Sequence, residues 1–306
     1  MARSTPLPAH AVRVPTYAEL QRYVHAFAQG HLNLLMILGN PGVGKSRSVH
    51  QALTEPVCWI GGQATAFGIF LEAYHHRHQP IVLDDVDGLD TNRDGIRLLK
   101  ALAQTEPTKT LSWLSKTSLL DKAGVPCRFT TTSRLVMIGN SWKTLNDDVA
   151  ALEDRGHLLL FTPTALEVHR HAALWFWDQE IFDFVGQRLN LMVQHSLRTY
   201  LHAWELKQAG LNWRQGVLSR FVTGVALEVA QLKANPDFTS EAQRVQAFVQ
   251  SGAGCRATYF HHAKKIQPVT APPKITLTHI RPPIAVVPSK DYLDQLRRRF
   301  GRLGNG

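Results

Sequence analysis

The 306-residue chain has few cysteines and no long apolar run. Its cysteines, Cys58, Cys127 and Cys255, are odd in number and far apart, so neither a disulfide framework nor a paired-cysteine metal site is expected. No stretch of eighteen or more apolar residues, the length that spans a bilayer, occurs. Residues 1–15 mix Arg, Pro and His instead of forming the apolar core of a signal peptide. We therefore expect a cytoplasmic protein with no membrane-spanning segment.

The sequence also lacks a helix-turn-helix pattern, a zinc-finger spacing and a nuclease motif. Its net charge of +10 would suggest nucleic-acid binding, but residues 256–306 carry +8 and residues 1–255 only +2. This tail contains six prolines and is predicted to be an extended linker that ends in an amphipathic helix over 291–303. Arginines around the apolar face of such a helix suit DNA phosphates, an acidic partner or a membrane surface.

Short apolar runs alternate with helical segments over residues 1–162. The run Leu34–Leu38 is apolar without alternation, which is typical of a strand buried on both faces of a parallel sheet. The expected strands are 34–38, 57–60, 81–83, 135–138 and 157–161, and the expected helices are 17–29, 45–53, 64–77 and 93–104. This alternation predicts an α/β fold, a parallel sheet flanked by helices on both faces. Residues 108–113 and 129–132 are β-prone and predict a side hairpin.

After Pro163 the pattern is purely helical. Thr164 and Glu167 form a capping box, which predicts the start of a helix and of a second domain over 163–255. The helices expected there are 164–177, 178–189, 197–209 and 213–232.

The segment from Gly39 to Ser46 matches the pattern G-x-x-x-x-G-K-[ST] between a buried strand and a helix. Its residues are Gly39, Asn40, Pro41, Gly42, Val43, Gly44, Lys45 and Ser46. Glycines let the backbone bend tightly and bring its N–H groups against phosphate oxygens. Lys45 is then placed for the β- and γ-phosphates of ATP and Ser46 for Mg²⁺. The alternative is an ordinary glycine turn.

Two adjacent carboxylates, Asp84 and Asp85, end the next long apolar strand. With the loop, they make the chain similar to the P-loop ATPases. The resemblance implies that Asp84 holds Mg²⁺ and that Asp85 stands where many relatives carry the glutamate that polarises the attacking water. Because Asp is one methylene shorter, either the water sits closer, or hydrolysis is slow, or Asp87 takes this role. Solvated carboxylates that open a turn at Gly88 are the alternative.

Three further positions narrow the resemblance to the AAA+ branch, over about residues 30–210. Asn140 follows a third buried strand and is similar to the sensor 1 residue; its alternative is a simple turn with Gly139. The segment Ala151–Arg155 resembles the one that carries an arginine finger, which implies that Arg155 acts in trans in a ring or filament. Arg155 would otherwise be an ion-pair partner of Asp154. Arg198 is similar to a sensor 2 arginine, and region 163–255 then corresponds to the lid.

The insert over 108–132 is longer than the resemblance requires. Such inserts often face a central pore, so four of its side chains are candidates for gripping nucleic acid or polypeptide: Lys109, Trp113, Lys116 and Arg128. An ordinary hairpin is the alternative. Three clustered histidines, His75, His76 and His78, have no cysteine or carboxylate at ligand spacing, so they are not expected to bind a metal.

Three hypotheses follow. The chain is an ATPase that assembles on DNA through its tail and insert and loads or remodels a replication, transposition or mobile-element complex. Alternatively, it is a chaperone-type ATPase that acts on a protein partner, or a nucleotide-gated scaffold that hydrolyses ATP poorly because of Asp85.

Overall fold

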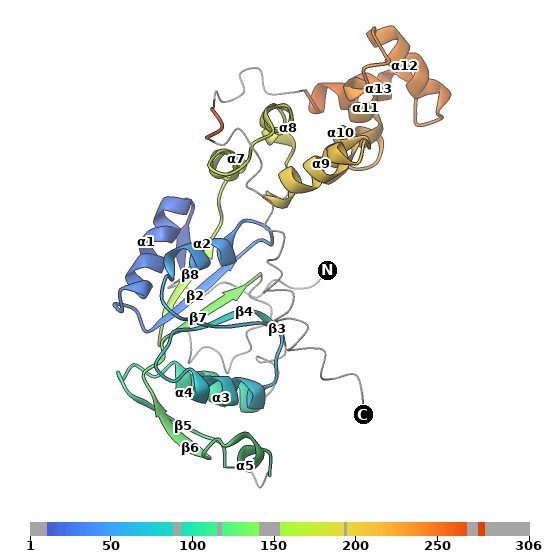
Figure 1. The fold of residues 1–306 in the computed structure, drawn as a ribbon. Coiled ribbons are helices and arrows are strands. Elements are labelled where there is room, and N and C mark those ends of the chain that lie inside the picture. The colour runs from blue at the N-terminus through green and yellow to red at the C-terminus, as the bar shows by residue number, and fades with distance from the viewer. Residues whose placement is uncertain are drawn as a thin grey trace. The chain divides into compact units, whose positions relative to one another are not determined.

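The computed structural model describes residues 11–87, 93–114, 118–140, 154–192, 195–267 and 275–278. The chain divides into two compact units, the first made of Met1–Val168 and Gln194–Leu197 and the second of His169–Val193 and Arg198–Gly306 (Figure 1). The first contains the sheets, and the second is built from helices.

In the described part of the first unit, six strands form a parallel sheet in the order β1-β8-β2-β7-β4-β3. These strands are β1 (Val12–Val14), β2 (Leu34–Gly39), β3 (Cys58–Gln63), β4 (Ile81–Asp87), β7 (Leu135–Gly139) and β8 (His157–Phe161). The helices of this unit are α1 (Tyr17–Ala28), α2 (Lys45–Ala52), α3 (Ala66–His75), α4 (Arg93–Leu102) and α5 (Leu119–Ala123). The predicted α/β class with a helix-flanked parallel sheet is confirmed. The short edge strand β1 was not predicted, because three residues give too little pattern.

Helices cover both faces of the sheet (Figure 1). Because side chains alternate along a strand, β2 supplies both cores. Met36 belongs to the buried cluster that contains Phe70 of α3, whereas Ile37 belongs to the cluster that contains Val49 of α2. The continuous apolar run therefore reflects burial on two sides.

A separate hairpin pairs β5 (Lys109–Ser112) antiparallel with β6 (Arg128–Thr131), which confirms the predicted pairing. Its buried side chains include Leu111 and Phe129, and the ring of Phe129 lies 5.1 Å from that of Phe70 on α3. The hairpin is thus packed onto the same core as the sheet.

The described second unit is helical. Its helices are α7 (Ala165–Ala173), which spans the division, α8 (Gln179–Gly186), the 3₁₀ helix Leu189–Leu191, α9 (Arg198–Gln208), α10 (Trp213–Phe221), α11 (Val225–Ala234), α12 (Glu241–Gln250) and α13 (Arg256–Lys265). The single helix expected over 213–232 is wrong, because α10 ends at Phe221 and Gly224, with φ 59°, precedes α11.

The prediction of an extended linker from residue 256 is wrong over its first ten residues. Residues Arg256–Lys265 form α13, which packs against α11 and α12. Tyr259 is fully buried there, its ring 5.5 Å from that of Phe248. The helix expected over 291–303 lies outside the described residues. Among those described, no helix has both the length and the apolar character needed to cross a bilayer.

Candidate nucleotide-binding site

The glycine-rich loop joins the end of β2 to the start of α2. Gly42 and Gly44 have φ of 78° and 86°, in the left-handed region that favours glycine. A Cβ on Gly42 would lie 2.2 Å from Ser196 Oγ, so the loop also leaves no room for a side chain at this position. Gly44 is the N-cap of α2 and offers no side chain to bond the first amides of that helix. These amides therefore form an anion-binding end of the kind that accepts phosphate.

Lys45 is buried beneath this loop, with 5% of its surface exposed. Its Nζ donates to Gly39 O at 2.8 Å, to Asn40 O at 3.0 Å and to Asn140 Oδ1 at 3.0 Å. A buried ammonium is stable only with such partners. The three acceptors hold its charge at the base of the loop.

Asp84, Asp85 and Asn140 meet the loop because their strands are neighbours. In the sheet β7 lies between β2 and β4, with Leu38 paired to Gly139 and Asp84 paired to Ile138. The carboxyl ends of parallel strands share one edge, which is where ligands bind in open α/β sheets.

Two hydrogen bonds link these polar side chains. Ser46 Oγ donates to Asp84 Oδ1 at 2.9 Å, and Asn140 Nδ2 donates to Asp85 Oδ2 at 2.8 Å. Asp85 has φ 47°, the one positive value among the described non-glycine residues. Asp tolerates this region better than most residues, and such backbone strain is concentrated at functional sites.

Arg155 lies near the amino ends of the parallel strands, whereas the glycine-rich loop lies at their carboxyl ends. Arg155 precedes β8, whose first residue His157 pairs with Leu35, while Phe161 at its other end pairs with Gly39. The two ends of β8 are four residues apart, which corresponds to about 13 Å along an extended strand. Arg155 Nη1 donates to Lys100 O at 2.6 Å in the last turn of α4. Within one chain Arg155 is therefore remote from the loop; Ala151–Glu153 lie outside the described residues.

Arg198, the other predicted arginine, is exposed at the start of α9 in the second unit. The residue before it, Leu197, belongs to the first unit and donates its backbone N–H to Gly42 O at 2.8 Å. A Cβ on Gly44 would lie 3.0 Å from Leu197 Cδ1. The segment that leads into α9 is thus anchored on the loop.

Tyr17 is a loop contact that the sequence did not indicate. Its hydroxyl donates to Val43 O at 2.7 Å, and burial, with the charge of Glu167, raises its pKa above the usual range. The Tyr17 backbone N–H donates to the Glu167 carboxylate, so the Glu167 side chain contacts the start of α1. The backbone N–H of Glu167 donates to Thr164 Oγ1. A tyrosine in an amphipathic helix carries no pattern that distinguishes a loop contact from core packing.

The insert does not present all the side chains that were candidates for gripping a substrate. The prediction that Lys109 grips a substrate is wrong. The Lys109 side chain is 1% exposed and donates to Asn33 Oδ1 at 2.6 Å and to Ser133 O at 2.7 Å. Burial lowers its pKa to about 8. Trp113 packs against Phe70 at 5.7 Å, Arg128 is exposed, and Lys116 lies outside the described residues.

The site combines an amide-lined loop, a buried ammonium and two carboxylates. This combination suits a nucleotide phosphate chain with a divalent cation, since the loop and ammonium attract oxyanions and the Ser46 and Asp84 oxygens are hard ligands.

Comparisons with known proteins give little beyond this geometry. No family model matches the chain. An uncharacterized 36.7 kDa protein of Enterobacteria phage T4, in the nrdC-mobD intergenic region, is 28% identical over 120 residues, 36% of this chain. The match spans 37% of that relative's length. The solved structure of PCH-2 from C. elegans aligns over 81% of this chain and 68% of its own, at 13% identity and a TM-score of 0.27, too low to support an argument.

Proposed function

We propose that this chain is an AAA+ ATPase that uses Mg²⁺ and ATP to load or remodel a partner complex on DNA. The observation that carries the proposal is the bridge made by Asn140 between Lys45 and Asp85, beside the bond from Ser46 to Asp84. It joins the phosphate-binding loop, the candidate metal ligands and the candidate general base Asp85 in one network.

The loop Gly39–Ser46 would bind the phosphates through its backbone amides. The partners of Lys45 include two carbonyl oxygens and one amide oxygen, which are uncharged. A γ-phosphate oxygen is a stronger acceptor because it is charged. On ATP binding we expect Lys45 to exchange at least one of these partners for the phosphate.

Ser46 and Asp84 would hold Mg²⁺, since their oxygens already lie 2.9 Å apart at the end of the loop. When bound there, Mg²⁺ would neutralise charge on the phosphate chain. Asp85 would accept a proton from the attacking water, and Asn140 would orient Asp85 and report on the phosphate through Lys45.

Arg155 would act on the nucleotide of a neighbouring copy. Its place at the amino edge of the sheet separates it from the loop of its own chain, so a role at the phosphates requires a ring or filament. Arg198 would report the nucleotide state to the helical unit, because it directly follows the anchored Leu197.

DNA is favoured as the partner by the charge of residues 256–306, +8. A protein client is the alternative, through the insert over 108–132. Among the described cations of the insert that were candidates for gripping a client, Arg128 is exposed.

The first experiment measures ATP binding and ATP hydrolysis by the full chain. We expect Lys45→Ala to lose both, and Lys122→Ala, which removes an exposed lysine from α5, to lose neither. Thermal unfolding of each variant separates loss of function from loss of fold. Equal turnover of Lys45→Ala and the wild type would overturn the proposal.

The second experiment adds DNA. We expect single- or double-stranded DNA to bind at low salt and to alter ATP turnover, and negative-stain images with an ATP analogue to show closed or filamentous assemblies. Turnover that responds only to a protein client would favour the chaperone hypothesis, and particles of a single chain would exclude action of Arg155 in trans.

A further inference from the structure

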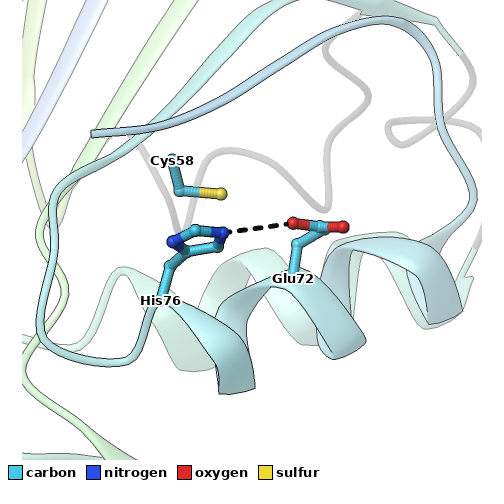
Figure 2. Close-up of side chains that lie close together, drawn as sticks. All are labelled: Cys58, Glu72 and His76. Carbon is cyan, nitrogen blue, oxygen red and sulfur yellow. Dashed lines mark ion pairs between the residues drawn. The ribbon is translucent and has the colours of Figure 1, made fainter. Parts of the chain in front are cut away.

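A second group of chemically reactive side chains lies on the far side of the first unit's core, between β3 and α3. Cys58 is the first residue of β3, Glu72 lies on α3, and His76 directly follows the last residue of α3. One ligand atom from each, Sγ, a carboxylate oxygen and a ring nitrogen, lies within 4.8 Å of the other two. Figure 2 shows the thiol, the imidazole and the carboxylate turned toward a common space.

This grouping corrects the expectation that the nearby histidines have no metal-ligating partners. Glu72 and His76 are four positions apart, so they share one face of a helix. Cys58 is 14 and 18 positions away in the sequence and reaches them only because β3 packs beside α3 in the folded unit. A search by spacing cannot detect such a group.

The ring of His76 is oriented for metal binding. Its Nδ1 lies 2.8 Å from Gln79 Oε1, an oxygen that can only accept, so Nδ1 carries a proton. In neutral imidazole the lone pair is then on Nε2, which faces Glu72 Oε2 at 3.4 Å. A cation between these two atoms satisfies both of them, whether it is the proton of an ion pair or a bound metal ion. A hydrogen bond that fixes the ring in this way is what metal-ligating histidines ordinarily have.

The separation of the His76 nitrogen from the Glu72 oxygen suits zinc. Tetrahedral coordination with bonds of about 2.0–2.1 Å puts nitrogen and oxygen ligands about 3.3 Å apart, close to the observed 3.4 Å. A soft thiolate with imidazole and carboxylate favours Zn²⁺ over Mg²⁺ or Ca²⁺. The site is reachable, since His76 and Glu72 side chains are 35% and 45% exposed while Cys58 is buried behind them.

We propose that Cys58, Glu72 and His76 form a Zn²⁺ site, with water as the fourth ligand, that ties β3 to α3. The site is separate from the nucleotide loop, and its proposal does not rest on ATPase activity. Cys58 would bind the metal as the thiolate, so its thiol proton is released when the metal binds.

The test uses the full, tag-free chain stripped with a chelator and titrated with Co²⁺, a spectroscopic probe for zinc sites. We expect one equivalent to produce a thiolate-to-cobalt charge-transfer band in the near ultraviolet and Zn²⁺ to displace it. The nucleotide site, whose candidate ligands Ser46 and Asp84 are oxygens, cannot give this band. The thermal midpoint should rise with Zn²⁺.

Matched variants localise the metal. We expect Cys58→Ser to abolish the band and His76→Gln to weaken Co²⁺ binding at least tenfold. Cys127→Ser, which removes an exposed thiol, and His75→Gln, which removes the neighbouring imidazole, should behave as the wild type. His76 is partly exposed, so His76→Gln tests the site even if Cys58→Ser unfolds.

Absence of the band in the wild type, or an undiminished band in both Cys58→Ser and His76→Gln, would overturn the proposal. The group would then be an ion pair on α3 beside a buried thiol.

Discussion

The side-chain oxygen of Asn140 accepts a hydrogen bond from Lys45 Nζ at 3.0 Å, although 95 positions separate the two residues. The same side chain donates from Nδ2 to Asp85. Because an ammonium only donates and a carboxylate only accepts, one orientation of the amide satisfies both partners. A single planar group therefore connects Lys45 to Asp85.

The glycine at position 42 is expected to be essential for nucleotide binding. Gly42→Ala places a methyl group at φ 78° and against Ser196, so we expect ATP affinity to fall at least tenfold. Gly62→Ala is the matched control, since Gly62 has φ 73° but a methyl group there would meet no heavy atom within 4 Å. It should lose about 1 kcal/mol of stability and no affinity. Calorimetric ATP titration and denaturant unfolding check both; equal affinities would contradict the expectation.

Asp85 decides whether the chain is a motor or a scaffold. Asp85→Asn preserves the left-handed backbone and the size of the side chain but removes the negative charge. If Asp85 is the general base, we expect turnover to fall about 100-fold, with the Kd for ATP changed by only a few fold. Steady-state hydrolysis measures this, with Asp121→Asn as the exposed control on α5. Turnover that barely changes would favour the nucleotide-gated scaffold.

Arg155 should show two separable effects. Arg155→Ala removes the hydrogen bond to Lys100 O, which should cost about 1 kcal/mol of stability. If Arg155 also acts in trans, turnover should fall at least 100-fold while ATP binding persists.

A mixing experiment distinguishes this role from a structural one. Adding excess Lys45→Ala chains, which carry an intact Arg155, should restore activity to Arg155→Ala chains. Failure of this rescue in mixtures that form mixed oligomers would contradict action in trans.

Acid should destabilise the helical unit through His169. This side chain is 1% exposed, stacks on Phe182 at 3.9 Å and bonds the Tyr200 hydroxyl at 2.8 Å, and burial lowers its pKa from 6.5 to about 4. Between these values the unfolded chain binds more protons, so stability falls as pH drops from about 6.5 to 4. The loss is on the order of 3 kcal/mol at about 1.36 kcal/mol per pKa unit.

His169→Phe keeps an aromatic ring and cannot titrate. We expect its free energy of unfolding to change less than that of the wild type over this pH range, as measured by urea unfolding at pH 7 and pH 4.5. Parallel pH curves for the two proteins would show that His169 is not the group responsible.

Local pattern was sufficient for most of the first unit. The apolar runs predicted β2, β4, β7 and β8, and Thr16 begins α1 by accepting from the Glu19 N–H as a capping residue should. In the second unit, local sequence pattern predicted the helix boundaries less well. The break between α10 and α11 occurs in a segment whose apolar spacing continues, and α13 was hidden because its sequence is basic and precedes prolines.

The sequence by itself determined the loop and the strand ends. The glycines and the Lys-Ser pair of the loop are close together in the sequence, and the carboxylates directly follow their apolar strand. Only the tertiary structure decided which of these groups meet. The order of the strands puts Asn140 between Lys45 and Asp85, packs β3 beside α3 so that Cys58 joins His76, and places Arg155 at the other edge of the sheet. Strand order depends on packing across the whole unit, and no local pattern encodes it.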